Sequence, residues 1–227
     1  MNAEIFKPTI VEYLTNKKND SEFEIRFHAR TMMNRGVSQK LFENIKMNLD
    51  ANTEFKIVNC KGEITRVHLA QRGYRYISYV NGKHVLNHKT KVASYDLTEY
   101  NMRFSEADEK DIDNVTPQNF TKNYKIIGLR DKHRYSYMHK SGMWRVDITN
   151  AVSNGEKSYE IEMEFIKGSN IQKASIFGNH IVMMMLRYIQ QSDYVISNKY
   201  AYELINAYKS YTKGGAKEFA GPLPRTI

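Results

Sequence analysis

The sequence predicts a mainly β fold of the α+β class, a barrel or a sandwich of short strands with helices toward both ends of the chain. Three observations favour it. Short strand-like segments and tight turns fill the middle of the chain, helical periodicity occurs toward its ends, and two distant segments carry glutamates on alternate positions. The 227 residues suit one domain with one core.

Two helices are expected in the first quarter of the chain. Residues 4–14 carry an apolar stripe, and we expect a break or kink near Pro8, because proline cannot continue the hydrogen bonding of a helix interior. Ser38 can cap a second helix, in which leucine or isoleucine recurs at every fourth position over residues 41–49. This helix is expected to cover the outside of the sheet.

Two predicted strands, EFEIRF at residues 22–27 and YEIEMEF at residues 159–165, place glutamates on alternate positions. Because residues i, i+2 and i+4 of a strand share a face, each segment has one acidic and one apolar face. The carboxylates either point to solvent or face one another inside a closed barrel. In a barrel their repulsion would be costly without a divalent cation between them, and such oxygen ligands favour Mg²⁺ or Mn²⁺.

Most of the chain between these two segments reads as β structure. The further predicted strands cover residues 55–57, 64–68, 74–79, 84–86, 101–105, 124–129, 134–138 and 144–149. Asn81-Gly82 and Lys140-Ser141-Gly142 predict tight hairpin turns. Residues 108–117 are acidic and rich in turn formers, which predicts a surface loop.

Helical periodicity returns after the second acidic segment. One stripe contains Ile181, Met185 and Ile189, and another contains Tyr200, Leu204, Ile205 and Tyr208. Ser197 is expected to cap the second of these helices, and the run of three methionines at 183–185 to fill the core. Residues 1–212 are expected to form the domain, and residues 213–227, with their Gly and Pro, a linker in a longer polypeptide.

The composition favours a soluble, cytoplasmic protein with a polyanionic partner. There are 34 Lys and Arg against 25 Asp and Glu, a formal charge of +9. A single cysteine, Cys60, excludes an internal disulfide framework and a cysteine zinc site. The histidines lack zinc-site spacing, and no apolar run is long enough to cross a membrane.

Cations alternate with apolar residues in the same way as the glutamates. The set contains Arg66, Arg103, Arg130, Lys132, Arg134 and Arg145, with Asp147 on the same face as Arg145. Arginine binds phosphate oxygens through a bidentate fork and lysine through a point charge. If these faces converge in one barrel, they provide what hydrolysis of a terminal phosphoryl group requires. For any one residue alone, an open sheet with a salt-bridged wet face is the competing interpretation.

The ordered motifs over residues 21–165 resemble the triphosphate tunnel metalloenzymes, specifically the metal-dependent RNA 5′-triphosphatases of fungal and large-DNA-virus mRNA capping systems. The two acidic segments resemble the family's first and last metal-binding strands, and RDKHRYS at 130–136 and WRVDIT at 144–149 follow the virus-type order. The resemblance implies an eight-stranded antiparallel barrel, a tunnel with helices packed outside. It also implies a hydrolase that removes the γ-phosphate of 5′-triphosphate RNA, with nucleoside triphosphatase side activity.

The resemblance further implies roles for individual residues. Mg²⁺ or Mn²⁺ would be held by Glu22, Glu24, Glu162 and Glu164. Phosphate would be bound by Arg66, Arg103, Arg130, Lys132, Arg134 and Arg145. The catalytic set would be Glu160, Glu162, Arg66, Arg103, Lys132 and Arg134, supported by Glu109 and Asp147.

The expected partners are 5′-triphosphate RNA and nucleoside triphosphates, with no membrane. Residues 219–227 resemble the lead-in to the guanylyltransferase module of multifunctional viral capping enzymes. Guanylyltransferase and methyltransferase modules are therefore expected in the same polypeptide, located in the cytoplasm, or in a viral factory or virion if the protein is viral.

Two other functions stay open at this point. One is a small-molecule triphosphatase or cyclase of the CYTH branch, whose opening strand typically carries Glu-x-Glu-x-Lys, whereas Arg26 stands here in place of the lysine. The other is a nonenzymatic RNA-binding barrel that uses its positive charge and its 16 Tyr and 10 Phe residues. Metal-dependent release of γ-phosphate separates the enzyme from the binding module.

Overall fold

The computed structural model describes residues 4–18, 21–29, 36–112 and 116–214. The strands in these ranges are β1 (Ser21–Phe27), β2 (Phe55–Ile57), β3 (Glu63–Ala70), β4 (Tyr74–Tyr79), β5 (His84–Leu97), β6 (Met102–Ile112), β7 (Ile126–His139), β8 (Trp144–Ser153) and β9 (Glu156–Phe165). The α-helices are α1 (Lys7–Asn16), α2 (Gln39–Ala51), α3 (Pro117–Asn123), α4 (Ile171–Gln190) and α5 (Asn198–Gly214).

The strands form one antiparallel sheet that closes on itself. Their order is β2-β7-β3-β4-β5-β6-β1-β9-β8, and β8 also pairs with β7. Eight strands therefore make a closed barrel, and β2 is a short ninth strand beside the end of β7. The predicted eight-stranded antiparallel barrel with helices outside is confirmed.

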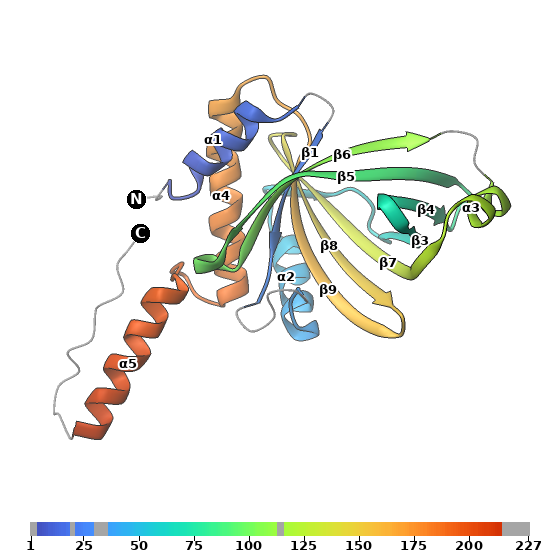
Figure 1. Cartoon of the computed structure of the whole chain (residues 1–227). Coiled ribbons are helices and arrows are strands. Elements are labelled where there is room, and N and C mark those ends of the chain that lie inside the picture. Colours follow the sequence, from blue (N-terminus) through green and yellow to red (C-terminus); the bar gives the residue numbers. More distant parts are fainter. Residues whose placement is uncertain (1–3, 19–20, 30–35, 113–115, 215–227) are drawn as a thin grey trace.

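The main hydrophobic core lies outside the barrel, between its wall and the helices α1, α2 and α4 (Figure 1). The apolar faces of the two acidic strands point into this core, and Phe23, Ile25 and Met163 are fully buried. Trp144 of β8 joins them and donates a hydrogen bond from Nε1 to the carbonyl of Ala174 in α4, at 2.8 Å. Because the apolar faces point outward, the opposite strand faces are left to line the barrel interior.

A smaller cluster covers another part of the barrel wall. Phe120 of α3 packs on Tyr76 of β4 and is grouped with Leu86 of β5. The side chain of Thr116 caps α3 by accepting a hydrogen bond from the backbone N–H of Asn119 at 3.2 Å. Both predicted hairpin turns are present, with Gly82 and Gly142 at positive φ, as tight turns of this kind require.

The predicted helices are largely confirmed. Ser38 caps α2 by accepting a hydrogen bond from the N–H of Leu41 at 3.3 Å, and Ser197 accepts one from Tyr200 at 3.2 Å. The methionine run lies in the core. The expected kink near Pro8 was wrong: proline lies in the first turn of α1, where its missing N–H leaves no helical bond unmade.

The second predicted apolar stripe near the C-terminus is not buried as a whole. Ile205 and Tyr208 of α5 are exposed, because α5 extends away from the barrel (Figure 1). This helix continues through residues 213–214, which had been assigned to the linker, and residues 215–227 lie outside the described ranges. No helix in the described ranges is long and apolar enough to cross a membrane.

The strand boundaries differ most from the sequence prediction in β5, β6 and β7. Residues 108–112 belong to β6 and not to a surface loop, and residues 113–115 lie outside the described ranges. β5 extends to Leu97, eleven residues past the predicted end at 86, and the two segments at 124–129 and 134–138 are parts of the single strand β7. In each case the strand carries polar residues on its inner face, so it lacks the apolar alternation that marks a half-buried strand.

Candidate active site in the barrel interior

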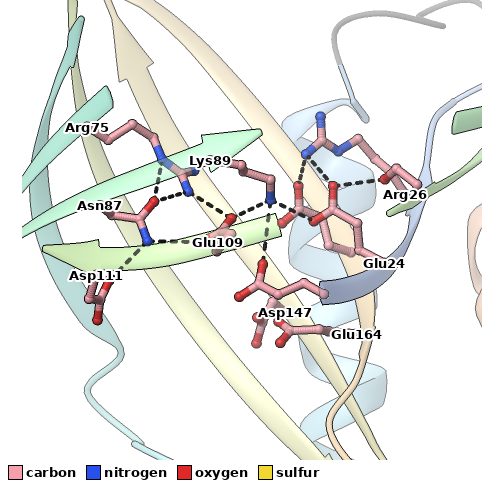
Figure 2. A network of polar contacts seen from close by, with 12 residues as sticks. Glu24, Arg26, Arg75, Asn87, Lys89, Glu109, Asp111, Asp147 and Glu164 are labelled. Atoms are coloured by element: carbon pink, nitrogen blue, oxygen red, sulfur yellow. Dashed lines mark hydrogen bonds and ion pairs between the residues drawn. The ribbon is translucent and has the colours of Figure 1, made fainter. Parts of the chain in front are cut away.

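The barrel encloses a cavity of about 760 Å³ with a mostly charged wall. Ten Lys or Arg residues and eight Asp or Glu residues line it. Charges withdrawn from water are stable only when paired or when their protonation changes. The wall is accordingly a network of ion pairs and hydrogen bonds, part of which is drawn in Figure 2.

The two acidic strands are neighbours in this wall. β1 pairs with β9 so that Glu24 lies directly opposite Glu164, and Arg26 directly opposite Glu162. Glu22 is two residues from Glu24 on the same inner face, and Glu109 of β6 lines the same cavity. Four carboxylates from three strands therefore gather on one side of the interior: Glu22, Glu24, Glu109 and Glu164.

Lys89 of β5 reaches into this carboxylate cluster (Figure 2). Its Nζ lies 2.6 Å from Glu109, 3.6 Å from Glu22 and 3.8 Å from Glu24. Burial alone would lower the pKa of Lys89, but the carboxylates of Glu24 and Glu109 outweigh it and raise the pKa. A cation is thus already stabilised at this point by the charge of its surroundings.

Two carboxyl groups of the carboxylate cluster have raised pKa values. Burial, with the nearby carboxylates of Glu109 and Glu164, raises the pKa of Glu22, and burial likewise raises the pKa of Glu164. Burial is the leading cause of both shifts, so a ligand that stabilises the ionised carboxylates would be favoured here. An oxygen-only set of carboxylate donors fits a hard divalent cation. In the described ranges, no group of three or more His, Cys, Asp or Glu residues is already arranged as a metal site, because Lys and Arg side chains hold the carboxylates.

The other two glutamates on the inner face of β9 are paired with arginines. Glu162 pairs with Arg26, and although burial would raise the pKa of Glu162, Arg26 and Arg134 lower it. Glu160 pairs with Arg130, on the same strand face as Glu162. Arginines therefore fix the positions of Glu160 and Glu162 along β9.

Arg145 of β8 connects the acidic cluster to a neighbouring strand. It pairs with Glu164, and it donates from Nη2 to Asp147 at 2.8 Å. Asp147, whose side chain is only 3% exposed, also lies 3.6 Å from Arg134. Asp147 thus orients two of the cations that line the cavity.

Arg130, Lys132 and Arg134 project from β7 into the cavity. Arg130 and Arg134 have carboxylate partners, whereas Lys132 has no ion-pair partner within the part of the chain that the structure describes. Burial, together with the neighbouring Arg134 and Arg130, lowers the pKa of Lys132 to about 8. Lys132 is therefore a half-buried amine available to an incoming anion.

Most of the residues predicted from the sequence line this cavity. They are Glu22, Glu24, Arg103, Glu109, Arg130, Lys132, Arg134, Arg145, Glu162 and Glu164. Glu160 and Asp147 are held against lining arginines. Arg103 lies toward one end, where Asp96 accepts two hydrogen bonds from its guanidinium at 2.6 and 3.0 Å.

Arg66 is the exception, and its predicted place in the interior was wrong. Its neighbours Thr65 and Val67 line the cavity, so Arg66 points outward. There it forms a bidentate pair with Asp131 at 2.7 and 3.1 Å, and its side chain is 58% exposed. Charged and apolar residues do alternate along β3. The prediction placed Val67 in the outer core, but Val67 lies on the inner face of the barrel, so Arg66 lies on the outer face.

Sequence reasoning missed a second group of polar interior residues on β4 and β5. Arg75 donates to Asn87 at 2.6 Å and pairs with Glu109 at 2.7 Å, and Asn87 donates to Asp111 at 3.0 Å (Figure 2). Lys89 belongs to the same network. The alternation of residues 85, 87, 89 and 91 could have revealed this face, had the strand not been ended at residue 86.

A closed antiparallel barrel with helices outside and an interior of facing carboxylates and cations defines the tunnel-fold phosphohydrolase class. A comparison with protein families matches residues 2–179 to "mRNA capping enzyme, beta chain". The chain belongs to this family, the RNA triphosphatases of mRNA capping. No curated protein matches the sequence.

Solved structures show the same fold. The RNA triphosphatase domain of a trifunctional mimivirus mRNA capping enzyme is 15% identical with a TM-score of 0.58, covering 81% of this chain and 97% of that one. The S. pombe Pct1 RNA triphosphatase is 16% identical with a TM-score of 0.53, covering 83% and 88%. At such identities the likeness establishes the fold, and the family match rests on the sequence.

Proposed function

We propose that this domain removes the γ-phosphate from the 5′-triphosphate end of RNA, the first step of mRNA cap formation, using Mg²⁺ or Mn²⁺, and that it also hydrolyses nucleoside triphosphates. One observation carries the proposal. A single enclosed cavity holds the paired carboxylates of β1 and β9 and the three alternating cations of β7. Acidic and basic groups facing one enclosed space suit a metal and a polyphosphate together.

Glu22, Glu24 and Glu164 are the residues that would hold the metal. They lie together in the carboxylate cluster, and their oxygens are hard donors. The bound metal would neutralise charge on the phosphate oxygens and acidify water. Glu162 is the fourth metal ligand inferred from the resemblance. Arginines lower the pKa of Glu162, whereas burial raises the pKa of Glu164, so we assign Glu162 another role.

The cations of β7 would bind the triphosphate. Lys132 has no carboxylate partner to displace among the described residues, and Arg134 is already oriented by Asp147. Arginine and lysine donors aimed at the transferred group stabilise charge that is spread over its oxygens. Arg145, placed between Glu164 and Asp147, would connect the phosphate and metal regions.

Glu162 would orient the attacking water. Because Arg26 and Arg134 lower its pKa, Glu162 stays ionised near neutral pH and accepts a hydrogen bond from water. Glu160, held by Arg130, would position that arginine from the same strand face.

The two other functions are less well supported. A nonenzymatic RNA-binding barrel has no need of facing carboxylates, and the aromatic residues Phe23 and Phe27 pack in the outer core. The family match also favours RNA triphosphatase over a CYTH-type enzyme. On the likeness to the trifunctional mimivirus enzyme, we further propose that guanylyltransferase and methyltransferase modules act with this domain in the cytoplasm or a viral factory.

The test is release of γ-phosphate from 5′-triphosphate RNA with Mg²⁺, with Mn²⁺ and with chelator. Glu24→Ala and Glu162→Ala should each reduce release about 100-fold or more, because an aligned charged group is removed from the reacting centre. Full activity in both folded variants would refute the proposal.

The protein offers a matched pair of arginine variants as a control. Arg134→Ala removes an inward guanidinium and should lower the release rate strongly, whereas Arg66→Ala removes an outward one and should leave it near wild type. Circular dichroism would confirm that both variants are folded. Equal losses would contradict the assignment of phosphate binding to the inner face.

A further inference from the structure

We infer that Tyr79 and Lys83, at the tip of the β4–β5 hairpin, bind the first nucleotide of the RNA: the tyrosine ring stacks on its base, and the lysine contacts the phosphodiester that follows. The inference rests on the proposed function and deepens it. It identifies the hairpin end of the cavity as the one through which RNA enters. It also identifies Tyr79 as the residue that distinguishes nucleotides from inorganic polyphosphate.

Tyr79 is unlike the rest of the cavity wall. Among the lining residues in the described ranges it is the only aromatic one; the others are charged, polar or aliphatic. Nζ of Lys83 lies over its ring, 5.6 Å from the centroid. An aromatic ring beside a cation is the combination with which proteins bind a base and the adjoining backbone of single-stranded nucleic acid.

The hairpin tip is one of the places where the cavity reaches solvent. Lys83 lines the cavity yet is exposed, and Val80 at the tip is 77% exposed. A Cβ added to Gly82 would meet no atom within 4 Å, so the turn stands clear of other elements. The hairpin also belongs to the part of the barrel away from α1, α4 and α5, at the end where α3 lies (Figure 1).

The sheet register connects Tyr79 to the phosphate-binding cations. Tyr79 is opposite Thr65, and Thr65 is opposite Lys132 on the next strand. All three side chains face the cavity, so they form one row across β4, β3 and β7. Two strand spacings separate the ends of the row, about 10 Å. A nucleoside at Tyr79 would therefore place its triphosphate along the row toward Lys132 and the interior.

The surroundings of Tyr79 confirm that it faces inward. Burial, with the carboxylates of Glu63 on β3 and Asp111 on β6, raises its pKa, whereas Arg134 on β7 opposes the shift. At the other end of the cavity the lining residues are Lys91, Ser94 and Arg103, without an aromatic ring. The base-binding chemistry is thus confined to the hairpin end.

The experiment compares three substrates that share the triphosphate: a short RNA with a 5′-triphosphate, a nucleoside triphosphate and inorganic tripolyphosphate. Tyr79→Leu should lower kcat/KM for the RNA and the nucleotide, relative to tripolyphosphate, by about 5- to 140-fold, the range for loss of one base–aromatic stack. Tyr79→Phe keeps the ring and should keep the wild-type ratio. Lys83→Gln should lower the RNA value relative to the mononucleotide.

Tyr95→Leu is the control, because Tyr95 is an exposed tyrosine on β5 that does not line the cavity. Its substrate ratios should equal those of wild type. The inference is overturned if Tyr79→Leu lowers all three substrates equally, which indicates a wall residue only, or if the ratios do not change.

Failure of the proposed function is distinguishable, since then the wild-type protein releases no γ-phosphate from any of the three. In that case metal-free binding of a labelled 5′-triphosphate RNA, followed by fluorescence anisotropy, still decides the inference. Tyr79→Leu should weaken this binding by a similar factor, and unchanged binding would overturn it.

Discussion

At the residue scale, the surroundings of each side chain in the barrel interior decide the direction of its pKa shift. Lys132 lies half-buried among arginines and its pKa is lowered, whereas Lys89 lies half-buried among carboxylates and its pKa is raised. The same residue type therefore serves two purposes in one cavity. Lys89 balances the protein's own anions, and Lys132 is left for an anion from outside.

Lys132 should give phosphate binding a pH dependence. With its pKa lowered to about 8, Lys132 loses its charge as pH rises from 7 to 9. If only the charged form binds, the Kd for tripolyphosphate should rise about tenfold over that interval. Isothermal titration calorimetry measures it. Lys132→Arg, which stays protonated, should flatten the dependence, and an equally steep rise in this variant would contradict the role of Lys132.

Glu22 should make the metal-free protein less stable as pH rises. Its pKa is raised in the folded state, so folding favours the protonated form; that contribution is complete below the ordinary pKa of 4.5 and fades above it. Glu22→Gln should therefore raise the melting temperature of the metal-free protein at pH 7.5 and reduce the extra stabilisation by Mg²⁺. Differential scanning calorimetry with and without Mg²⁺ measures both. A variant less stable than wild type in chelator would count against this account.

At the element scale, the helices were easier to predict than the strands. α2 and α4 lie against an apolar wall, so each carries the spacing that the sequence predicted, with buried residues such as Ile45 and Ile181. The prediction ended β5 at residue 86 and β6 at residue 105. It missed the remaining parts of these strands because both of their faces are largely polar. A strand in a wet barrel carries no apolar face inward, so the usual alternation signal is weak.

The contact between α4 and β8 depends on Gly178. A Cβ built there would lie 2.7 Å from Cζ2 of Trp144 and 3.2 Å from Cδ1 of Ile10. Gly178→Ala should gain about 1 kcal/mol in helix propensity but lose more through overpacking, with net destabilisation of about 1–2 kcal/mol. Urea unfolding measures the difference. Gly168→Ala, where the closest atom is 3.4 Å away, is the control and should be nearly neutral.

At the scale of the whole molecule, the site could be predicted in outline because two simple patterns, alternating glutamates and alternating cations, are placed together by strand pairing alone. What could not be predicted was which face of a strand is the inner one when both carry plausible residues, as at Arg66. The inner face of each strand is the one opposite the helices, and the sequence of a single strand does not show where the helices pack. The inner face is therefore known only once the strand pairing of the closed barrel is known.

Because the hydrophobic core and the cavity lie on opposite faces of the barrel wall, substitutions at adjacent residues should have different effects. Ile25 and Arg26 are adjacent on β1, yet Ile25 is fully buried in the outer core and Arg26 lines the cavity. Ile25→Ala should cost about 2–5 kcal/mol in the free energy of unfolding. Arg26→Gln leaves the buried Glu162 without its ion-pair partner, so it should also lower stability, by about 3–5 kcal/mol, and it should in addition reduce γ-phosphate release. Ile25→Ala should leave the specific activity of the folded protein close to wild type. Chemical denaturation alongside activity measures both, and a loss of specific activity in Ile25→Ala would contradict the described faces.

The outer position of the core also has an evolutionary consequence. Since the barrel is stabilised from outside by helices, substitutions within it can exchange one ionic arrangement for another without dismantling the scaffold. Residues on the inner face can therefore change toward other polyphosphate substrates while the packing beneath the helices stays the same. Relatives with little sequence in common can then keep the same architecture, as the 15% identity to the mimivirus domain illustrates.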